Sequence, residues 1–302
     1  MKDGLNYKKS KIQSSKGDRT LELICYLILT AFAALCLFPF LLVISASFTD
    51  EYSLLWEGYK LIPSKFSVAA YELLGKTSQL LDAYKVTVFI TIVGTVLSML
   101  VTSAMAYALS VKKFRIRNKI AFFVYFTMLF SGGMVASYLV ISKYLHMRNS
   151  IWVFIIPALV NPWNMLLLRN FFATIPEALA ESAKIDGAND IVILFRIILP
   201  ISLPGMVTIG LFYALSYWNE WFRAMLFIDN EKLVTLQYLI MKILRNMNFA
   251  NTIAGSVGIS VDVPVYSVRM ATVVAAIGPI IFLYPFIQKY FVKGLTVGGV
   301  KG

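Results

Sequence analysis

Six long apolar stretches divide this chain and limit its possible folds more than any other feature. A helix that crosses a membrane needs about 20 mainly apolar residues, because each residue rises about 1.5 Å and the hydrocarbon is about 30 Å thick. Glycine and proline interrupt several stretches, which is tolerated where neighbouring helices satisfy the freed backbone groups. We predict an all-α integral membrane protein with about six transmembrane helices. The expected spans are residues 23–48, 86–109, 120–141, 151–168, 201–227 and 270–291.

The composition supports a chain that is solvated by lipid. Hydrophobic residues make up 59% and charged residues only 15%, which is too apolar for an ordinary soluble domain of this size. Cys25 and Cys36 lie inside the first apolar stretch, so we interpret them as small apolar residues of a helix. A single histidine, His146, excludes a multi-histidine metal site and is expected to be a solvated loop residue.

Basic residues predict the topology. The tail before the first span and the loop "VKKFRIRNK" after the second are both rich in lysine and arginine, which marks cytoplasmic segments. Two spans separate these segments, which places both on the same side of the membrane, in agreement with their charge. With six spans, both chain ends are predicted to be cytoplasmic. The net charge of +12 is therefore interpreted as a topology signal that faces anionic lipid, with no nucleic-acid partner. The first stretch exceeds the 7 to 15 apolar residues typical of a signal peptide, which favours an uncleaved span.

The segment 233–244 is apolar but short for a span. It is predicted to be an interfacial or re-entrant helix on the outward side. If it were a seventh span, the C-terminus would lie outside.

A charged segment, "AESAKIDGAND", follows the fourth span and is predicted to be cytoplasmic. Thr174 and Glu177 have the spacing of a capping box, with Pro176 in the first turn of a helix. Gly187 stands where a left-handed residue would end that helix.

A second short helix is expected directly after this glycine corner. Asn189 or Asp190 would cap it, and Pro200 would stop it. Small residues on the first helix leave room for a close partner; they are Ala180, Ser182 and Ala183.

The spacing within this segment closely resembles the EAA loop of bacterial ABC importer permeases. That pattern is E-A-A, three residues, G, nine residues, I-x-L-P, and here it reads from Glu181 through Gly187 to Pro200. Ser182 replaces the middle alanine, a small-for-small change. "KIDGA" is the form common in the sugar-importer branch, and the flanks "LLLRNFFATIPEAL" and "FRIILPISLPG" agree with it.

The resemblance implies that this loop forms a coupling helix, which docks in a cleft of a cytoplasmic ATPase subunit. Glu181 would pair with a basic residue there, and Gly187 would permit the corner. Closure of two ATPase subunits would then drive the permease between inward-open and outward-open states. The implied coupling residues are Glu181, Ser182, Ala183, Asp186, Gly187, Ala188, Leu199 and Pro200.

Two further stretches narrow the resemblance. "FSGGMVASYLVISKYLHMRNSIW" and the terminal "FVKGLTVGGVKG" resemble sugar permeases of the lipoprotein-associated and alginate-type subgroup. This implies import of oligosaccharides longer than a disaccharide across a bacterial cell membrane. It also implies three kinds of protein partner: a second, non-identical permease, two ATPase subunits, and an extracytoplasmic solute-binding lipoprotein.

The chain is predicted to be a transport subunit and not an enzyme. Gly75, Lys76 and Thr77 resemble the end of a phosphate-binding loop, but Ala70 stands where that loop needs glycine. ATP and magnesium would therefore be bound by the partner ATPase, and this chain would hold no cofactor or metal. The expected organisation is a tail over residues 1–20 and a permease domain over 21–302, with the coupling loop at about 172–200.

Polar groups inside two predicted spans are candidates for the substrate path. The candidates are Asn161, Asn164, Tyr217, Trp218, Asn219 and Glu220. The alternatives are hydrogen bonding between helices for the two asparagines, and an interfacial aromatic belt for Trp218 and Trp221. The outward segment 245–265 is polar enough to reach toward a binding protein's sugar site, a role implied by the resemblance.

Other functions stay open at this stage. An ABC permease for a non-sugar solute would share the EAA loop. An ion-coupled secondary transporter would need inverted repeats and paired intramembrane carboxylates, whereas Glu220 stands alone. A membrane enzyme is disfavoured by the lone histidine and the lack of an acidic cluster.

Overall fold

The computed structural model describes residues 16–75, 78–257, 264–278 and 281, and these residues are almost entirely helical. The only strand-like pairing among them is an isolated bridge between Thr49 and Phe66. The α-helices are α1 (Lys16–Ser47), α2 (Glu51–Glu57), α3 (Ala69–Gly75), α4 (Ser78–Ser110), α5 (Arg117–Leu129), α6 (Gly133–Leu139), α7 (Trp152–Ile155), α8 (Pro162–Ala173), α9 (Glu177–Ile185), α10 (Asp190–Ile193), α11 (Leu199–Ile201), α12 (Leu203–Trp218), α13 (Phe222–Phe227) and α14 (Leu236–Val257). A further helix, Val265–Gly278, follows them.

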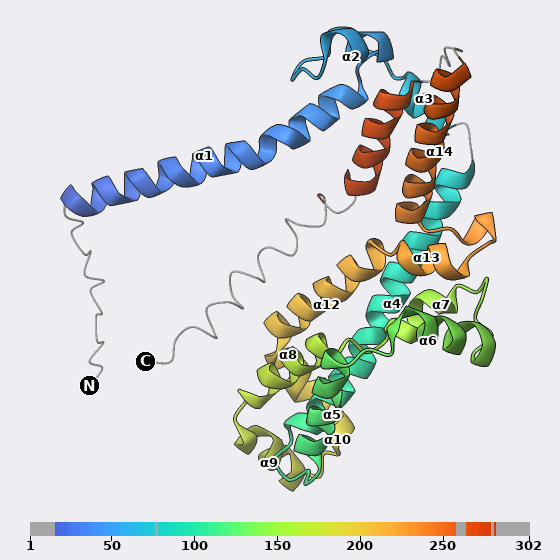
Figure 1. Ribbon diagram of the computed structural model, residues 1–302. Helices are drawn as coiled ribbons and strands as arrows, with labels where there is room; N and C mark the ends of the chain where they lie inside the picture. The colour runs from blue at the N-terminus through green and yellow to red at the C-terminus, as the bar shows by residue number, and fades with distance from the viewer. Residues whose placement is uncertain (1–15, 76–77, 258–263, 279–280, 282–302) are drawn as a thin grey trace.

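Helix α4 is the axis on which the other helices are assembled (Figure 1). It packs against α12, α8, α5 and α14. Its buried face carries small residues, so the facing helix approaches closely. A Cβ added to Gly94 would lie 2.7 Å from the ring of Tyr217 on α12, so only glycine leaves room for that ring.

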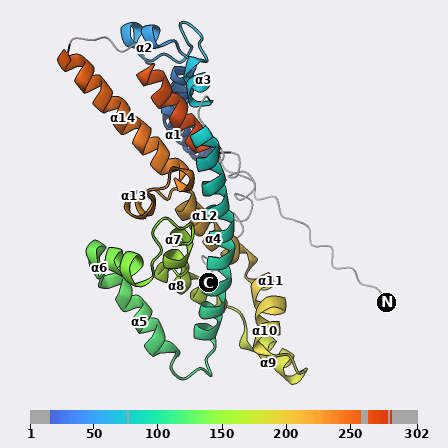
Figure 2. The same cartoon turned by 90° about the vertical axis from the view of Figure 1, so that its right-hand side faces the viewer.

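The two ends of α4 carry different structures (Figure 2). Helices α9 and α10 lie at its C-terminal end, and α2, α3 and α14 lie at its N-terminal end. The predicted cytoplasmic loop and the predicted outward segments are thus at opposite ends of the molecule.

Several predicted spans are broken. Only Arg19–Ser47 and Ser78–Ser110 are continuous helices long and apolar enough to cross a membrane, and three bent pairs could supply three more spans in the described part of the chain. The pairs bend by 111° between α5 and α6, by 50° before α8, and by 90° before α12. Gly133, with φ +81°, and Pro162 mark the first two breaks, because neither residue favours a continuous helix. The sixth predicted span lies mostly outside the described residues.

Helix α14 is longer than the predicted 233–244 segment. A short 3₁₀ turn, Glu231–Leu233, precedes it, and the helix then runs for 22 residues. Leu236, Leu239 and Ile240 are buried near its start, where it packs against α4 and α13.

Helix α1 diverges from the rest of the described chain (Figure 1). None of its most apolar window is buried, and Cys25 and Cys36 are free and exposed on it. Apolar side chains along most of its length, from Leu21 to Ile44, are therefore left for lipid or another protein to cover.

Candidate functional site

The predicted coupling loop is a pair of short helices, as expected, but its first cap differs. Helix α9 begins at Glu177, with Pro176 at the N-cap and no side-chain cap. The Thr174 hydroxyl instead donates to the Phe171 carbonyl at 2.7 Å. Thr174 still has helical backbone angles at the end of α8, so its hydroxyl reaches back one turn. The predicted capping box is therefore wrong.

The glycine corner is confirmed. Gly187 has φ +84°, and its N–H donates to the Lys184 carbonyl at 3.1 Å. The Ala188 N–H donates to the Ala183 carbonyl at 2.9 Å, which completes a Schellman motif. Asn189, and not Asp190, caps the second helix, because its side chain accepts from the Val192 N–H at 2.9 Å.

Pro200 does not end the second helix. Helix α10 continues through a wider π-helical turn, Leu194–Ile198, into α11, so Pro200 lies inside the last turn. The π turn ends two residues before Pro200, the one residue of this helix that lacks an N–H for the helical ladder. The chain changes direction only after Ile201, where it bends by 90° into α12.

The small residues of α9 were predicted to leave room for a close partner, but not all of them face outward. Ala180 and Ala183 pack against a core cluster that includes Phe172, Ile193 and Ile198, so they let α9 lie close to its own chain. Ser182 is exposed, together with Leu179 and Ile185. Ile185 is 87% exposed, and sequence reasoning did not select it, although an apolar residue between lysine and aspartate in a charged loop is a signal.

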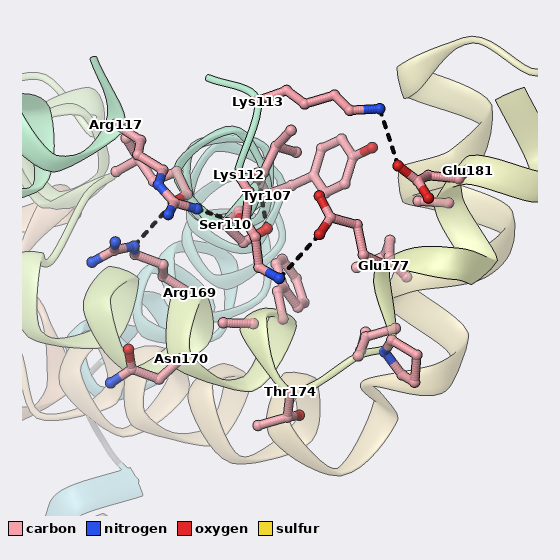
Figure 3. Close-up of a pocket in the computed structure, with 18 of the residues that line it drawn as sticks. Tyr107, Ser110, Lys112, Lys113, Arg117, Arg169, Asn170, Thr174, Glu177 and Glu181 are labelled. Atoms are coloured by element: carbon pink, nitrogen blue, oxygen red, sulfur yellow. Dashed lines mark hydrogen bonds and ion pairs between the residues drawn. The ribbon is translucent and has the colours of Figure 1, made fainter. Parts of the chain in front are cut away.

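Three exposed ion pairs hold the loop, and Figure 3 shows two of them. Glu177 pairs with Lys112 at 3.1 Å and Glu181 with Lys113 at 3.0 Å, both across to the loop after α4. Glu181 raises the pKa of Lys113 through a hydrogen bond and through charge attraction. Within α9 and α10, Lys184 pairs with Asp190 at 2.8 Å. Glu181, which the resemblance assigns to a basic residue of the ATPase, is thus paired inside its own chain here.

A cavity of about 600 Å³, here called the aromatic cavity, collects part of the predicted substrate path. It lies between the start of α8 and the end of α12. Its lining includes Asn161, Trp163, Asn164, Phe212, Tyr213, Ser216, Tyr217 and Arg223. A second cavity of about 610 Å³ shares Pro157, Ser216 and Arg223 with it and reaches Glu220.

Buried and partly buried hydrogen bonds fix the wall of the aromatic cavity. The Tyr213 hydroxyl accepts from the Asn161 N–H at 2.9 Å and bonds to the Thr102 hydroxyl at 2.7 Å. The Asn161 side chain caps α8 by accepting from the Asn164 N–H at 3.1 Å. The backbone N–H of Asn161, and not its side-chain amide, makes the hydrogen bond between helices.

The remaining candidates divide between buried and exposed positions. Tyr217 is buried and bonds to the Ser98 hydroxyl at 2.8 Å, about 18 Å along α4 from its C-terminal end. Trp218 is also buried, and its indole N–H donates to the Ala276 carbonyl at 3.2 Å, so in this chain it is not an aromatic-belt residue. Asn219 is exposed and bonds within its own helix. Neither Trp218 nor Asn219 lines the two cavities.

The sequence showed Glu220 without a second intramembrane carboxylate, and the structure pairs it with a basic residue, Arg223. Its carboxylate accepts from both the backbone N–H and the guanidinium of Arg223. Its own carbonyl accepts from the Thr235 hydroxyl at 2.6 Å. Arg223 was missed although an arginine inside a predicted span is a signal by default.

Comparison with known proteins decides the family. Residues 98–297, which contain the coupling loop and both cavities, match the family described as "Binding-protein-dependent transport system inner membrane component". The chain belongs to this family. It is a multi-pass inner-membrane permease of the carbohydrate-uptake branch, a component of a binding-protein-dependent ABC transporter, and a partner ATPase binds ATP.

Individual relatives cover almost the whole permease. The polygalacturonan/rhamnogalacturonan transport system permease protein YtcP of Bacillus subtilis is 40% identical over 94% of this chain and 99% of its own. Protein LplC of the same organism is 36% identical over 96% of this chain and 98% of its own. A chain of a bacterial ABC transporter involved in the import of the acidic polysaccharide alginate superposes with a TM-score of 0.79, at 29% identity, over 92% of this chain and 99% of that chain.

Proposed function

We propose that this permease carries oligosaccharides that contain uronic acid residues, and that a partner ATPase drives it through α9. The observation that carries the substrate class is Arg223, a cation in the wall between two cavities of a chain that spans a membrane. A guanidinium presents paired donors that match a carboxylate. The relatives named above for polygalacturonan and for alginate handle acidic polysaccharides.

The rest of the aromatic cavity suits a sugar. Trp163 is 57% exposed, so its face is available for a sugar ring, and Phe212 lies in the same wall. Ser216 and Asn164 line the cavity beside them and supply groups that hydrogen-bond to hydroxyls. Arg223 would exchange part of its contact with Glu220 for the carboxylate of the substrate.

The coupling role rests on the outer face of α9. Leu179, Ser182 and Ile185 are exposed on it, and an apolar side chain as open as Ile185 fits a partner's cleft. Docking there by two ATPase subunits, one on each permease, would move α9 and, through its attachment to the core, α12. The basic residues that flank the first and second spans support cytoplasmic chain ends.

A second, non-identical permease and an extracytoplasmic binding lipoprotein complete the proposed importer. The uncovered length of α1 supports a partner permease, because a second chain or lipid must cover it. Segment 245–265, the proposed reach toward the binding protein, lies partly outside the described residues.

The test of the substrate is uptake by the complete importer in liposomes that contain ATP. We expect galacturonate oligosaccharides to enter, and Arg223→Gln to lower their uptake about tenfold, as loss of a charge-assisted bond would. The double variant Glu220→Gln/Arg223→Gln removes the pair without leaving an unpaired charge and should be equally defective. Arg148→Gln, which breaks an exposed ion pair with Asp229, is the matched control and should transport normally.

Two results would contradict the proposal. One is normal uptake of acidic oligosaccharides by both Arg223 variants. The other is uptake that an uncoupler abolishes while removal of ATP does not, which would point to an ion-coupled transporter. For the coupling role, Glu181→Lys should leave the complex assembled but lower ATP-driven uptake, and normal uptake would exclude that role.

A further inference from the structure

A pocket of about 530 Å³ lies at the α9 end of the molecule, away from both cavities, and we call it the basic pocket. The end of α4, the loop after it, the end of α8 and α9 surround it (Figure 3). Five basic and two acidic side chains line it, so its surface carries an excess of positive charge. They are Lys112, Lys113, Arg117, Arg169 and Lys184, with Glu177 and Glu181.

The lysines and the arginines of this pocket differ in their partners. Each lysine pairs with a carboxylate: Lys112 with Glu177, Lys113 with Glu181, and Lys184 with Asp190. Arg117 and Arg169 have no ion-pair partner among the described residues. The two guanidiniums lie on one side of the pocket and the two glutamates on the other (Figure 3).

Neutral oxygens hold the two arginines in place. Arg117 donates to the Ser110 carbonyl at 3.4 Å, and Arg169 donates to the Leu109 carbonyl at 3.0 Å. Because these carbonyls belong to successive residues at the end of α4, both guanidiniums are anchored at the same point. Arg169 also donates to the Asn118 side chain at 3.4 Å. Each guanidinium has five N–H donors, so both keep donors for an anion in the pocket.

The surroundings favour a lipid as the source of that anion. The pocket lies at the ends of the apolar helices α4 and α8 and at the start of α5, where a membrane surface would be. Helix α5 starts at Arg117 and exposes Phe122 and Phe123, which suit acyl chains. Basic pockets between membrane helices are known to bind anionic headgroups. We propose that the basic pocket binds the phosphate of an anionic phospholipid headgroup through Arg117 and Arg169.

The site has a mechanical consequence. Arg117 is the first residue of α5 and directly follows the short connection from α4 that carries Lys112 and Lys113, the two lysines that pair with α9. A lipid bound to Arg117 and Arg169 fixes this connection, and the pairs with Glu177 and Glu181 pass that constraint to α9. Anionic lipid should therefore stiffen the coupling loop.

The direct test is lipid retention by the purified complex, measured by native mass spectrometry. In detergent with equal phosphatidylglycerol and phosphatidylcholine, we expect the wild type to retain phosphatidylglycerol in preference. Arg117→Gln/Arg169→Gln should weaken this retention by roughly tenfold or more, since two charge-assisted contacts are lost. Arg115→Gln/Lys119→Gln is the matched control, because it removes the same charge from exposed residues near the same loop that do not line the pocket.

A conservative variant covers the case in which the glutamine variant does not assemble. Arg117→Lys/Arg169→Lys keeps both charges but loses the paired donors, and should retain several-fold less lipid than the wild type. Equal retention by wild type, the lysine variant and any glutamine variant that assembles would overturn the proposal. A further outcome is that millimolar inorganic phosphate displaces the lipid and raises the thermal midpoint of the complex as much as the lipid does. That result would show a free-phosphate site and would also overturn the proposal.

Lipid retention does not depend on transport. A failure of the uronate proposal would leave it unchanged, and a failure here would leave the substrate assignment unchanged.

Discussion

The coupling loop and the aromatic cavity are built in opposite ways. The loop is shaped by neighbours in sequence: Gly187 turns it, and Asn189 starts its second helix. Its charges are exposed, and so are Leu179, Ser182 and Ile185 on its outer face. The cavity wall joins Thr102 on α4, the α8 cap Asn161 and Tyr213 on α12, which are far apart in sequence, by one buried and one partly buried hydrogen bond.

This difference separates two kinds of failure. A surface loop with a fixed local shape transmits force to and from a partner, so damage there should cost transport while the protein stays assembled. The cavity wall is part of the packing of α4, α8 and α12, so damage there should cost stability first. The following substitutions test that division.

Gly187→Pro should have the largest effect. Proline cannot adopt φ +84°, and it removes the N–H that bonds to the Lys184 carbonyl, so the corner between α9 and α10 is lost. We expect ATP-driven uptake to fall by about tenfold or more, with normal amounts of assembled complex. Gly58→Pro, at another glycine with positive φ but at the opposite end of the molecule, is the control. A similar loss of uptake in both variants would contradict a specific role of the coupling loop in transport.

Gly94→Ala should destabilise the complex without touching the loop. The new methyl group would stand 2.7 Å from the Tyr217 ring, which is buried, and such overpacking costs about 1–3 kcal/mol. Gly210→Ala provides the control, because its nearest neighbour, the Met99 sulfur, is 3.9 Å away. The measurement is the thermal midpoint of each purified complex. Equal midpoints would mean that α12 does not pack on α4 as closely as described.

Tyr213→Phe should cost somewhat less. It removes one hydroxyl but leaves the buried Thr102 hydroxyl and the partly buried Asn161 N–H without that partner, at about 1–2 kcal/mol. Tyr138→Phe is matched to it, because the Tyr138 ring stacks on Phe227 and no hydrogen bond of its hydroxyl is found among the described residues. Thermal unfolding should therefore separate the two variants. If Tyr138→Phe lowered the thermal midpoint as much as Tyr213→Phe, the packing around the ring, and not the hydrogen bond, would account for the loss of stability.

The same contrast explains what the sequence could predict. The glycine corner, a cap at Asn189 or Asp190 and the family spacing are local, and each was predictable from a few consecutive residues. Thr174 was wrongly predicted to cap α9. It lies at the C-terminal end of α8, and the local spacing did not show how far α8 extends. The orientation of Ala180 and Ala183 depended on the core cluster beneath them.

The cavity needed the tertiary structure. Asn161 and Tyr217 were selected for their depth, but no pattern placed Asn161 beside Tyr213 or Arg223 between two cavities. Breaks within several long spans were expected, but the sequence did not place the sharp bends at residues 131–133, 161–162 and 202, because apolarity predicts burial in lipid and not straightness. Trp218 was judged by its type, whereas its indole partner, the Ala276 carbonyl, lies far along the chain.

Lys113→Gln should have the smallest effect on stability. The Lys113–Glu181 pair is exposed on both sides, and solvent screens exposed pairs so well that many contribute nothing measurable. Because Glu181 raises the pKa of Lys113, the lysine keeps its charge at neutral and mildly alkaline pH, and the pair should not change across that range. Lys184→Gln, which breaks the equally exposed pair with Asp190, should behave alike. If Lys113→Gln alone lowered the thermal midpoint as much as Tyr213→Phe does, the loop would be part of the packed structure and the division drawn between the two regions would fail.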